Sequence, residues 1–225
     1  MRRHFEDIEA EIKNQILSMG GLAEEMIRAS IEGLRERRHE PLEKVARDEE
    51  RVNGLHMDID NRCLNLIALH QPAAADLRFI IAAIKINSDL ERVGDQAVNI
   101  AQTTERLLGH PQLERKLLDI PRMAELAQAM LKDSLDAFVA KDVPLARKVL
   151  ARDAEEDQLK SESFHELLQL MQSDSSTVER ALGLILISRN LERIADHATN
   201  IAEDVVFMTL GKDIRHHAER AEDPD

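Results

Sequence analysis

Three observations predict that this chain of 225 residues folds as an all-α protein with six long helices. Aromatic residues make up only 2% of the sequence, with no Trp and no Tyr. This composition favours helix-on-helix packing over strands, which are enriched in aromatic and β-branched side chains. Proline and glycine are sparse, and prolines at four places with a Ser/Asp-rich stretch at a fifth mark breaks between long segments. The third observation is a motif that occurs twice, which indicates two related halves.

Five breaks separate the six predicted helices, and they lie at residues 39–41, 70–72, 109–121, 142–144 and 173–177. Pro41, Pro121 and Pro144 each stand near the start of a predicted helix, where proline's missing N–H leaves no hydrogen bond unmade. Ser176 and Glu179 have the spacing of a capping box, which predicts the start of the last helix. Because the connections are short, we expect neighbouring helices to pack antiparallel, as in helical bundles.

The repeated motif runs from Asp89 to Ala101 and again from Asn190 to Ala202. Both copies read Leu-Glu-Arg-[Val/Ile]-x-Asp-x-Ala-x-Asn-Ile-Ala. The similarity extends upstream, because the segment after Lys44 can be aligned with the segment after Lys148. We therefore predict two tandem three-helix bundles, at residues 5–108 and 120–210. A linker at 109–119 joins them, and a flexible tail follows at 211–225.

Composition and motifs exclude several classes of protein. A net charge of −13 argues against nucleic-acid binding, which requires a basic face. The apolar stretches are too short to cross a bilayer, so we expect no membrane insertion and a cytoplasmic protein. The single Cys63 cannot form an internal disulfide and is expected in the core. Nucleophile elbows, Walker-type loops and His-Glu-x-x-His are absent from the sequence, so we expect no enzyme activity.

Each half carries four oxygen-bearing side chains, spaced four residues apart on two successive helices. They are Glu49, Asn53, Glu91 and Asp95 in the first half, and Asp153, Asp157, Glu192 and Asp196 in the second. Residues four apart share a helix face, and neighbouring carboxylates repel each other unless a cation offsets their charge. All-oxygen ligation favours Mg²⁺ or Mn²⁺, with iron plausible and zinc less favoured. Asn99 and Asn200, one turn further on, are placed to orient a water or a ligand carboxylate.

Other interpretations of these acids remain open at this stage. They can form ordinary surface ion pairs with Arg92, Arg193 and neighbouring basic residues, as helical acids usually do. The chain would then be a metal-free helical scaffold. A ferritin-like di-iron enzyme is disfavoured, because Gly94 and Ala195 stand where that site needs histidine. A different carboxylate metalloenzyme is the remaining alternative. The first helix also holds acids that are candidates for additional ligands, namely Glu6, Glu9, Glu24 and Glu25.

The chain resembles the PhoU family of bacterial phosphate-uptake regulators over nearly all of residues 5–216. The resemblance is carried by three elements: Gln71-Pro72-x-Ala-x-Asp-Leu-Arg78, the two Leu-Glu-Arg-[Val/Ile]-x-Asp motifs, and Gly-Lys-Asp-Ile-Arg-His216. It implies two similar three-helix bundles, a homodimer, and metal clusters bound by paired [Glu/Asp]-x-x-x-Asp motifs.

The resemblance also implies a function. It suggests a negative regulator that links the ATPase subunit of a phosphate ABC transporter to a sensor histidine kinase. Seven of the eight residues spaced four apart match the family's metal motifs, namely Glu49, Glu91, Asp95, Asp153, Asp157, Glu192 and Asp196. Asn53 departs from that pattern, because an acid, Asp157, stands at the corresponding position of the second half. We therefore expect the first site to bind metal more weakly.

Overall fold

The computed structural model describes residues 2–113 and 119–215, and within them the secondary structure is entirely helical. Six α-helices are present in the described chain, with one short 3-10 segment, η1 (Ser175–Thr177). The helices are α1 (Arg2–Glu36), α2 (Glu40–His70), α3 (Ala75–Leu108), α4 (Ile120–Ala140), α5 (Val143–Ser173) and α6 (Val178–Leu210). The predicted fold class and number of helices are confirmed.

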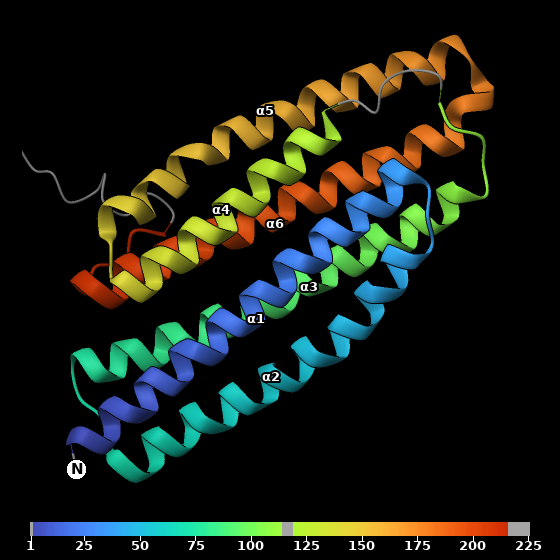
Figure 1. Ribbon diagram of the computed structural model, residues 1–225. Coiled ribbons are helices and arrows are strands. Elements are labelled where there is room, and N and C mark those ends of the chain that lie inside the picture. The colour runs from blue at the N-terminus through green and yellow to red at the C-terminus, as the bar shows by residue number, and fades with distance from the viewer. Residues whose placement is uncertain (1, 114–118, 216–225) are drawn as a thin grey trace, which may run out of the picture.

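The helices form two three-helix bundles that pack side by side (Figure 1). The bundles are α1, α2 and α3 in the first half and α4, α5 and α6 in the second. Between the halves, α3 packs along α6 and α1 along α4, while α2 and α5 lie on the outside. The seam between α2 and α3 and the seam between α5 and α6, which carry the predicted acids, therefore lie in different parts of the molecule.

Local sequence signals explain most of the helix starts. Proline stands in the first turn of α2, α4 and α5, as predicted. The capping box predicted at Ser176 is wrong, because α6 begins at Val178 after Thr177, whose side chain makes no capping hydrogen bond. Instead, the Asp174 side chain accepts a hydrogen bond from the Ser176 backbone N–H at 2.9 Å. This bond starts the 3-10 turn, which shifts the helix start beyond the predicted cap.

The core runs through both bundles and is built from aliphatic side chains. Cys63 lies in it fully buried, as predicted. Gly20 on α1 lies against α4, where an added Cβ would come within 2.3 Å of the Leu135 Cδ1 atom. The absence of a side chain at Gly20 thus permits the close approach of the two halves. Neighbouring Gly21 faces open space.

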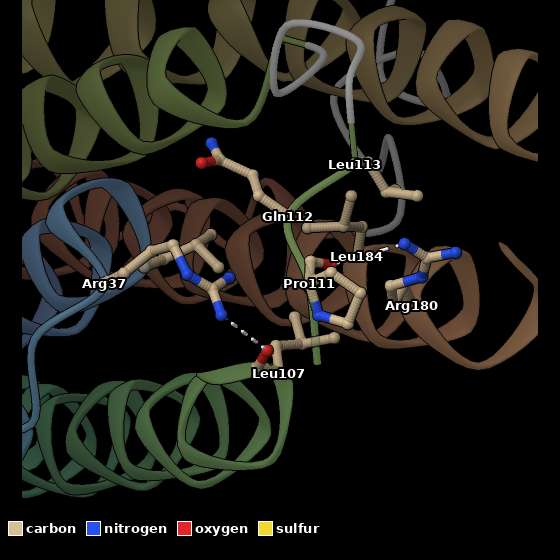
Figure 2. A pocket seen from close by; sticks show the side chains of 8 residues that line it. Arg37, Leu107, Pro111, Gln112, Leu113, Arg180 and Leu184 are labelled. Atoms are coloured by element: carbon tan, nitrogen blue, oxygen red, sulfur yellow. Dashed lines mark hydrogen bonds between the residues drawn. The ribbon is translucent and has the colours of Figure 1, made fainter. Parts of the chain in front are cut away.

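The described part of the linker is held by both halves (Figure 2). Arg37, after α1, donates to the backbone carbonyls of Leu108 at 2.9 Å and His110 at 2.5 Å. Arg180 on α6 donates to the carbonyl of Pro111 at 3.3 Å. The cavity between these side chains has a volume of about 30 Å³, which suits water rather than a larger ligand. Residues 114–118 of the predicted linker lie outside the described residues.

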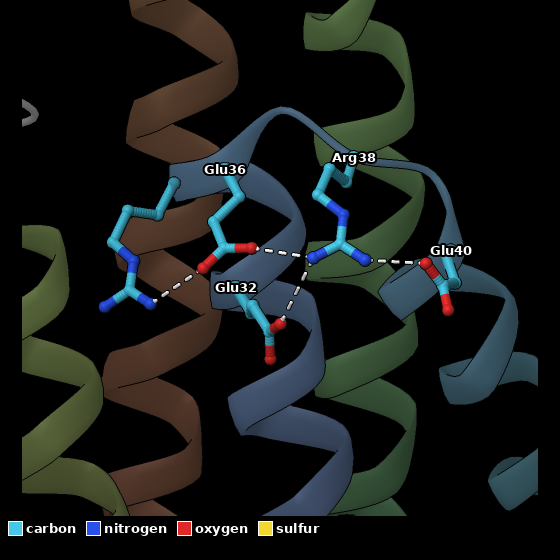
Figure 3. Close-up of polar contacts among 5 residues, drawn as sticks. Glu32, Glu36, Arg38 and Glu40 are labelled. Carbon is cyan, nitrogen blue, oxygen red and sulfur yellow. Dashed lines mark hydrogen bonds and ion pairs between the residues drawn. The ribbon is translucent and has the colours of Figure 1, made fainter.

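Equivalent turns connect the first two helices of each half. Arg37 and Lys141 both adopt the left-handed conformation, with φ of 55° and 54°. After the first turn, the Arg38 guanidinium binds Glu36 at 2.9 Å and Glu40 at 2.6 Å, which ties α1 to α2 (Figure 3). After the second, the Asp142 side chain instead accepts from the Leu145 N–H at 3.0 Å and caps α5. The two halves thus share backbone geometry but use different side chains.

The predicted tail is described only as far as residue 215. Gly211 ends α6 in the left-handed conformation with φ of 70°. Ile214 packs partly against the core. The rest of the predicted tail, including His216 of the closing motif, lies outside the described residues.

Candidate metal centre

The predicted acids of the second half come together where α5 packs along α6. Asp153 and Asp157 lie on α5, and Glu192 and Asp196 lie on α6. Burial raises the pKa of Asp153 above its ordinary value, and the charges of Asp157 and Glu192 raise it further. Burial, followed by Glu192 and Asp153, raises the pKa of Asp196 to about 6. These mutual effects show that the acids of the two helices face one another.

An ammonium group already lies within this cluster. The Lys160 Nζ atom is 2.6 Å from Asp157 Oδ1 and 2.7 Å from Glu192 Oε1, so it bridges α5 and α6. Hydrogen bonds to these two carboxylates raise the pKa of Lys160. Two of the predicted acids are therefore ion-paired, as the ion-pair interpretation expects. Their partner is Lys160, which the sequence did not single out.

Glu156 is a fifth carboxyl group in the same cluster, and the spacing of the acid pairs did not indicate it. Its side chain is 1% exposed. Neither of its carboxyl oxygens has a hydrogen-bond partner among the described residues. Burial raises the pKa of Glu156 to about 8, with further contributions from Glu192, Glu155, Asp157 and Asp153. A signal was available in the repeat, because the alignment that pairs Asn53 with Asp157 pairs Val52 with Glu156.

The first half brings its predicted residues to the seam between α2 and α3, but with different surroundings. Glu49 and Glu91 are partly buried, while Asn53 and Asp95 are exposed. Val52, at the position equivalent to Glu156, is 1% exposed. Its Cγ1 atom lies 3.4 Å from where a Cβ on Gly94 would be. An apolar contact therefore occupies the place of the buried carboxyl group.

The basic residue of the cluster also differs between the halves. His56, equivalent to Lys160, has its Nε2 atom 3.6 Å from Asp60 Oδ2. Within the described part of the chain, no ion pair involves Glu49, Glu91 or Asp95. A cation from the protein thus neutralises part of the second cluster only.

The asparagines one turn further on have different environments. Asn99 is exposed on α3. Asn200 donates to Asp89 Oδ1 at 3.3 Å, and the same oxygen lies 2.8 Å from His197 Nδ1. The amide of Asn200 therefore contacts the opposite half, at the α3–α6 interface. Its role in orienting a water or a ligand carboxylate stays a prediction.

The acids of the first helix have partners outside the two clusters. Glu9 pairs with Lys13 at 2.7 Å, and Glu25 pairs with Lys44 at 2.6 Å. Burial raises the pKa of Glu24, and Lys132 offsets part of that shift. These contacts give the first helix a role in packing and surface ion pairing.

The donor atoms of the second cluster are of the type that binds a hard cation, but the side chains are not arranged around a common point. As the described side chains stand, no three or more His, Cys, Asp or Glu residues are arranged to hold a metal ion. The chemistry nevertheless fits, because all donors are carboxylate oxygens and Glu156 leaves two buried oxygens without a partner. Asp196 is exposed and can adopt another rotamer, whereas Asp157 must first separate from Lys160.

Comparison with known proteins decides the family. A family model described as the PhoU domain matches twice, at residues 16–104 and 120–205. The chain belongs to the PhoU family. The two matches to this family fall within the predicted halves, one in each. They explain why α2 with α3 and α5 with α6 place acids at equivalent positions.

Relatives in the PhoU family are similar over most of the chain. A phosphate-specific transport system accessory protein PhoU homolog from Pseudomonas putida is 35% identical over 206 residues, which cover 92% of this chain and 80% of the relative. The homolog from Aquifex aeolicus is 37% identical, with 94% and 95% covered. Among solved structures, PhoU from Pseudomonas aeruginosa superposes with a TM-score of 0.89 at 32% identity, covering 92% of this chain and 100% of that one.

A second solved structure agrees. The phosphate transport system regulatory protein PhoU from Streptococcus pneumoniae gives a TM-score of 0.86 at 28% identity, with 93% of this chain and 98% of that one covered. None of the helices in the described ranges is sufficiently long and apolar to cross a membrane. The solved structures from Pseudomonas aeruginosa and Streptococcus pneumoniae both superpose on this arrangement of helices.

Proposed function

We propose that this protein is a cytoplasmic regulatory accessory protein of a phosphate transport system and a negative regulator of phosphate-starvation genes. In this role it acts as an adaptor between the ATPase subunit of the phosphate ABC transporter and a sensor histidine kinase. The observation that carries the proposal is the double match to the PhoU domain, together with relatives named as accessory proteins of phosphate-specific transport. A homodimer is part of the proposal.

The second part of the proposal concerns metal ions. The cation sites are formed by the four predicted residues of each half, with Mg²⁺, Mn²⁺, iron or Zn²⁺ as the ion. Glu49, Asn53, Glu91 and Asp95 form the first site, and Asp153, Asp157, Glu192 and Asp196 form the second. A bound cation would offset the carboxylate charge and tie the outer helix of each half to its central helix. This charge control would make partner binding depend on metal.

Among the described residues, no observation favours catalysis over binding. A metalloenzyme needs a positioned base and an open coordination site beside it. The acids of the second half are instead engaged with Lys160 and with one another. We therefore propose a regulatory role without turnover.

The test is binding to the purified ATPase subunit and to the kinase's cytoplasmic part, measured by biolayer interferometry with Mn²⁺ and with EDTA. The comparison variant combines E91A, D95A, E192A and D196A. We expect the wild-type chain to bind at least one partner, more tightly with Mn²⁺, and the variant to lose that metal dependence. Metal-independent binding by both proteins would instead support the scaffold interpretation. Absence of binding to either partner would contradict the adaptor role.

A further inference from the structure

The buried carboxyl group of Glu156 carries an inference that rests on the proposed metal sites and extends them. We propose that Glu156 is an additional ligand of a hard divalent cation between α5 and α6, and that Lys160 occupies this place when the cation is absent. The two halves are then unequal, and the cation binds to the second half more tightly than to the first.

The first argument is that Glu156 lies in a core position without a partner. It is 1% exposed, and both carboxyl oxygens lack a hydrogen bond among the described residues. A buried polar group without a partner destabilises a folded protein, so such a group calls for an explanation, and a bound ion is one. The equivalent position in the first half is Val52, which shows that the helix pair packs without a carboxyl group there.

The second argument is the place of Glu156 within the cluster. The charges that act on it come from Glu192 on α6, the largest of them, and from Glu155, Asp157 and Asp153 on its own helix. Its buried carboxyl group therefore lies close to the seam between the two helices. Carboxylate oxygens are the donors that Mg²⁺ and Mn²⁺ prefer, and a bound cation would draw those of the two helices together.

The third argument is the position of Lys160. This residue stands four after Glu156, at the spacing of a helical ion pair, yet its ammonium group binds Asp157 and Glu192 instead. Both carboxylates are predicted metal ligands, one from each helix. The ammonium thus lies between the two helices' ligands and offsets one of their two negative charges. A cation must displace it before both carboxylates are free to bind.

The experiment is a titration of EDTA-treated protein with Mn²⁺ alone, followed by electron paramagnetic resonance of the free ion. The variants are E156Q, which keeps the shape of the side chain, and K160M, which removes the ammonium. E155Q is the matched control, because Glu155 is exposed, pairs with Arg122 at 2.9 Å and carries the same charge one residue away. A double variant, D157A with E192A, removes ligands of the proposed cluster itself. Circular dichroism verifies that each variant is folded.

Even indirect partners of metal ligands contribute about 10–100-fold to affinity, so we expect E156Q to weaken Mn²⁺ binding at least about tenfold. E155Q should change the affinity less than about twofold, and K160M should tighten binding. Wild-type affinity in E156Q, or unchanged affinity in K160M, would overturn the inference. If that happened while D157A with E192A abolished binding, only this inference would be overturned, and the proposed metal site itself would stand. Absence of Mn²⁺ binding by both the wild type and K160M would overturn the metal site and this inference together.

Discussion

At equivalent positions the seam between α2 and α3 carries Val52, Asn53 and His56, whereas the seam between α5 and α6 carries Glu156, Asp157 and Lys160. Both halves match the PhoU domain and consist of three helices in the same order. The first seam closes on an apolar contact, and the second gathers carboxyl groups around one ammonium. Three changes along one helix face therefore alter the electrostatics of a seam without altering the fold.

The shared part of the two halves is apolar or internally satisfied. Val45 and Val149 are both buried at equivalent positions. Ser30 and Ser134 are both fully buried, and each hydroxyl donates to the carbonyl three residues earlier, at 2.8 Å and 2.7 Å. Such positions define the bundle. The positions that face the seam between the outer and central helices differ between the halves, and they determine the charge of that seam.

The largest expected effect tests whether the two halves are equivalent as scaffolds. Ile100 and Ile201 occupy the same place in the two motif copies and are both fully buried. We expect I100A and I201A each to lower the free energy of unfolding by about 2–5 kcal/mol, because each leaves a cavity in a packed core. Urea denaturation measures both. A small effect in one variant and a large effect in the other would show that the halves are not equivalent in packing.

A smaller effect, of opposite sign, is expected at the position where the halves differ. In the metal-free protein, E156V replaces an unpartnered buried carboxyl group by the residue that the first half uses. We expect a gain in stability of about 1–3 kcal/mol, the usual penalty of an unsatisfied buried polar group. Urea denaturation in EDTA measures it, with E155Q as the surface control. A loss of stability in E156V would show that Glu156 has a partner within the folded chain.

The third prediction concerns pH and applies to the metal-free protein. The folded-state pKa of Glu156 is raised from 4.5 to about 8 by burial and by the charges of Glu192, Glu155, Asp157 and Asp153. Between these values the folded protein keeps a proton that the unfolded chain has released, so stability falls as pH rises. Asp196, raised from 3.8 to about 6, contributes in the same direction over the lower part of this range.

Urea denaturation across this pH window checks the prediction. The fall in stability should be clearly smaller in E156V, which has no carboxyl group at this position. If wild type and E156V showed the same pH dependence, Glu156 would not titrate in the manner described.

The sequence predicts the helices well because their signals are local. Proline near three helix starts and the repeated motif place the elements and the two halves. The break before α6 was predicted but its capping residue was not, because the Asp174 side chain accepts from the Ser176 N–H and a 3-10 turn forms before the helix. Which of Asp174 and Ser176 acts as the cap depends on the backbone geometry of the turn, and residue spacing does not specify that geometry.

The candidate site was predicted only in part. Spacing placed Asp153, Asp157, Glu192 and Asp196 on facing helices, and their pKa shifts are consistent with that arrangement. Glu156 was missed because, within the run from Glu155 to Asp157, burial depends on how α6 packs and not on residue type. Lys160 was missed for a similar reason, since its ammonium reaches across to Glu192 on another helix.

The most direct test of the account is the affinity for Mn²⁺ of two half-specific variants, measured by isothermal titration calorimetry after EDTA treatment. One variant combines E91A and D95A in the first half, and the other combines E192A and D196A in the second. The account predicts that the first variant retains the tightest binding site of the wild-type protein and that the second loses it. Loss of the tightest site in the first variant, with its retention in the second, would contradict the claim that the second half is the stronger cation site.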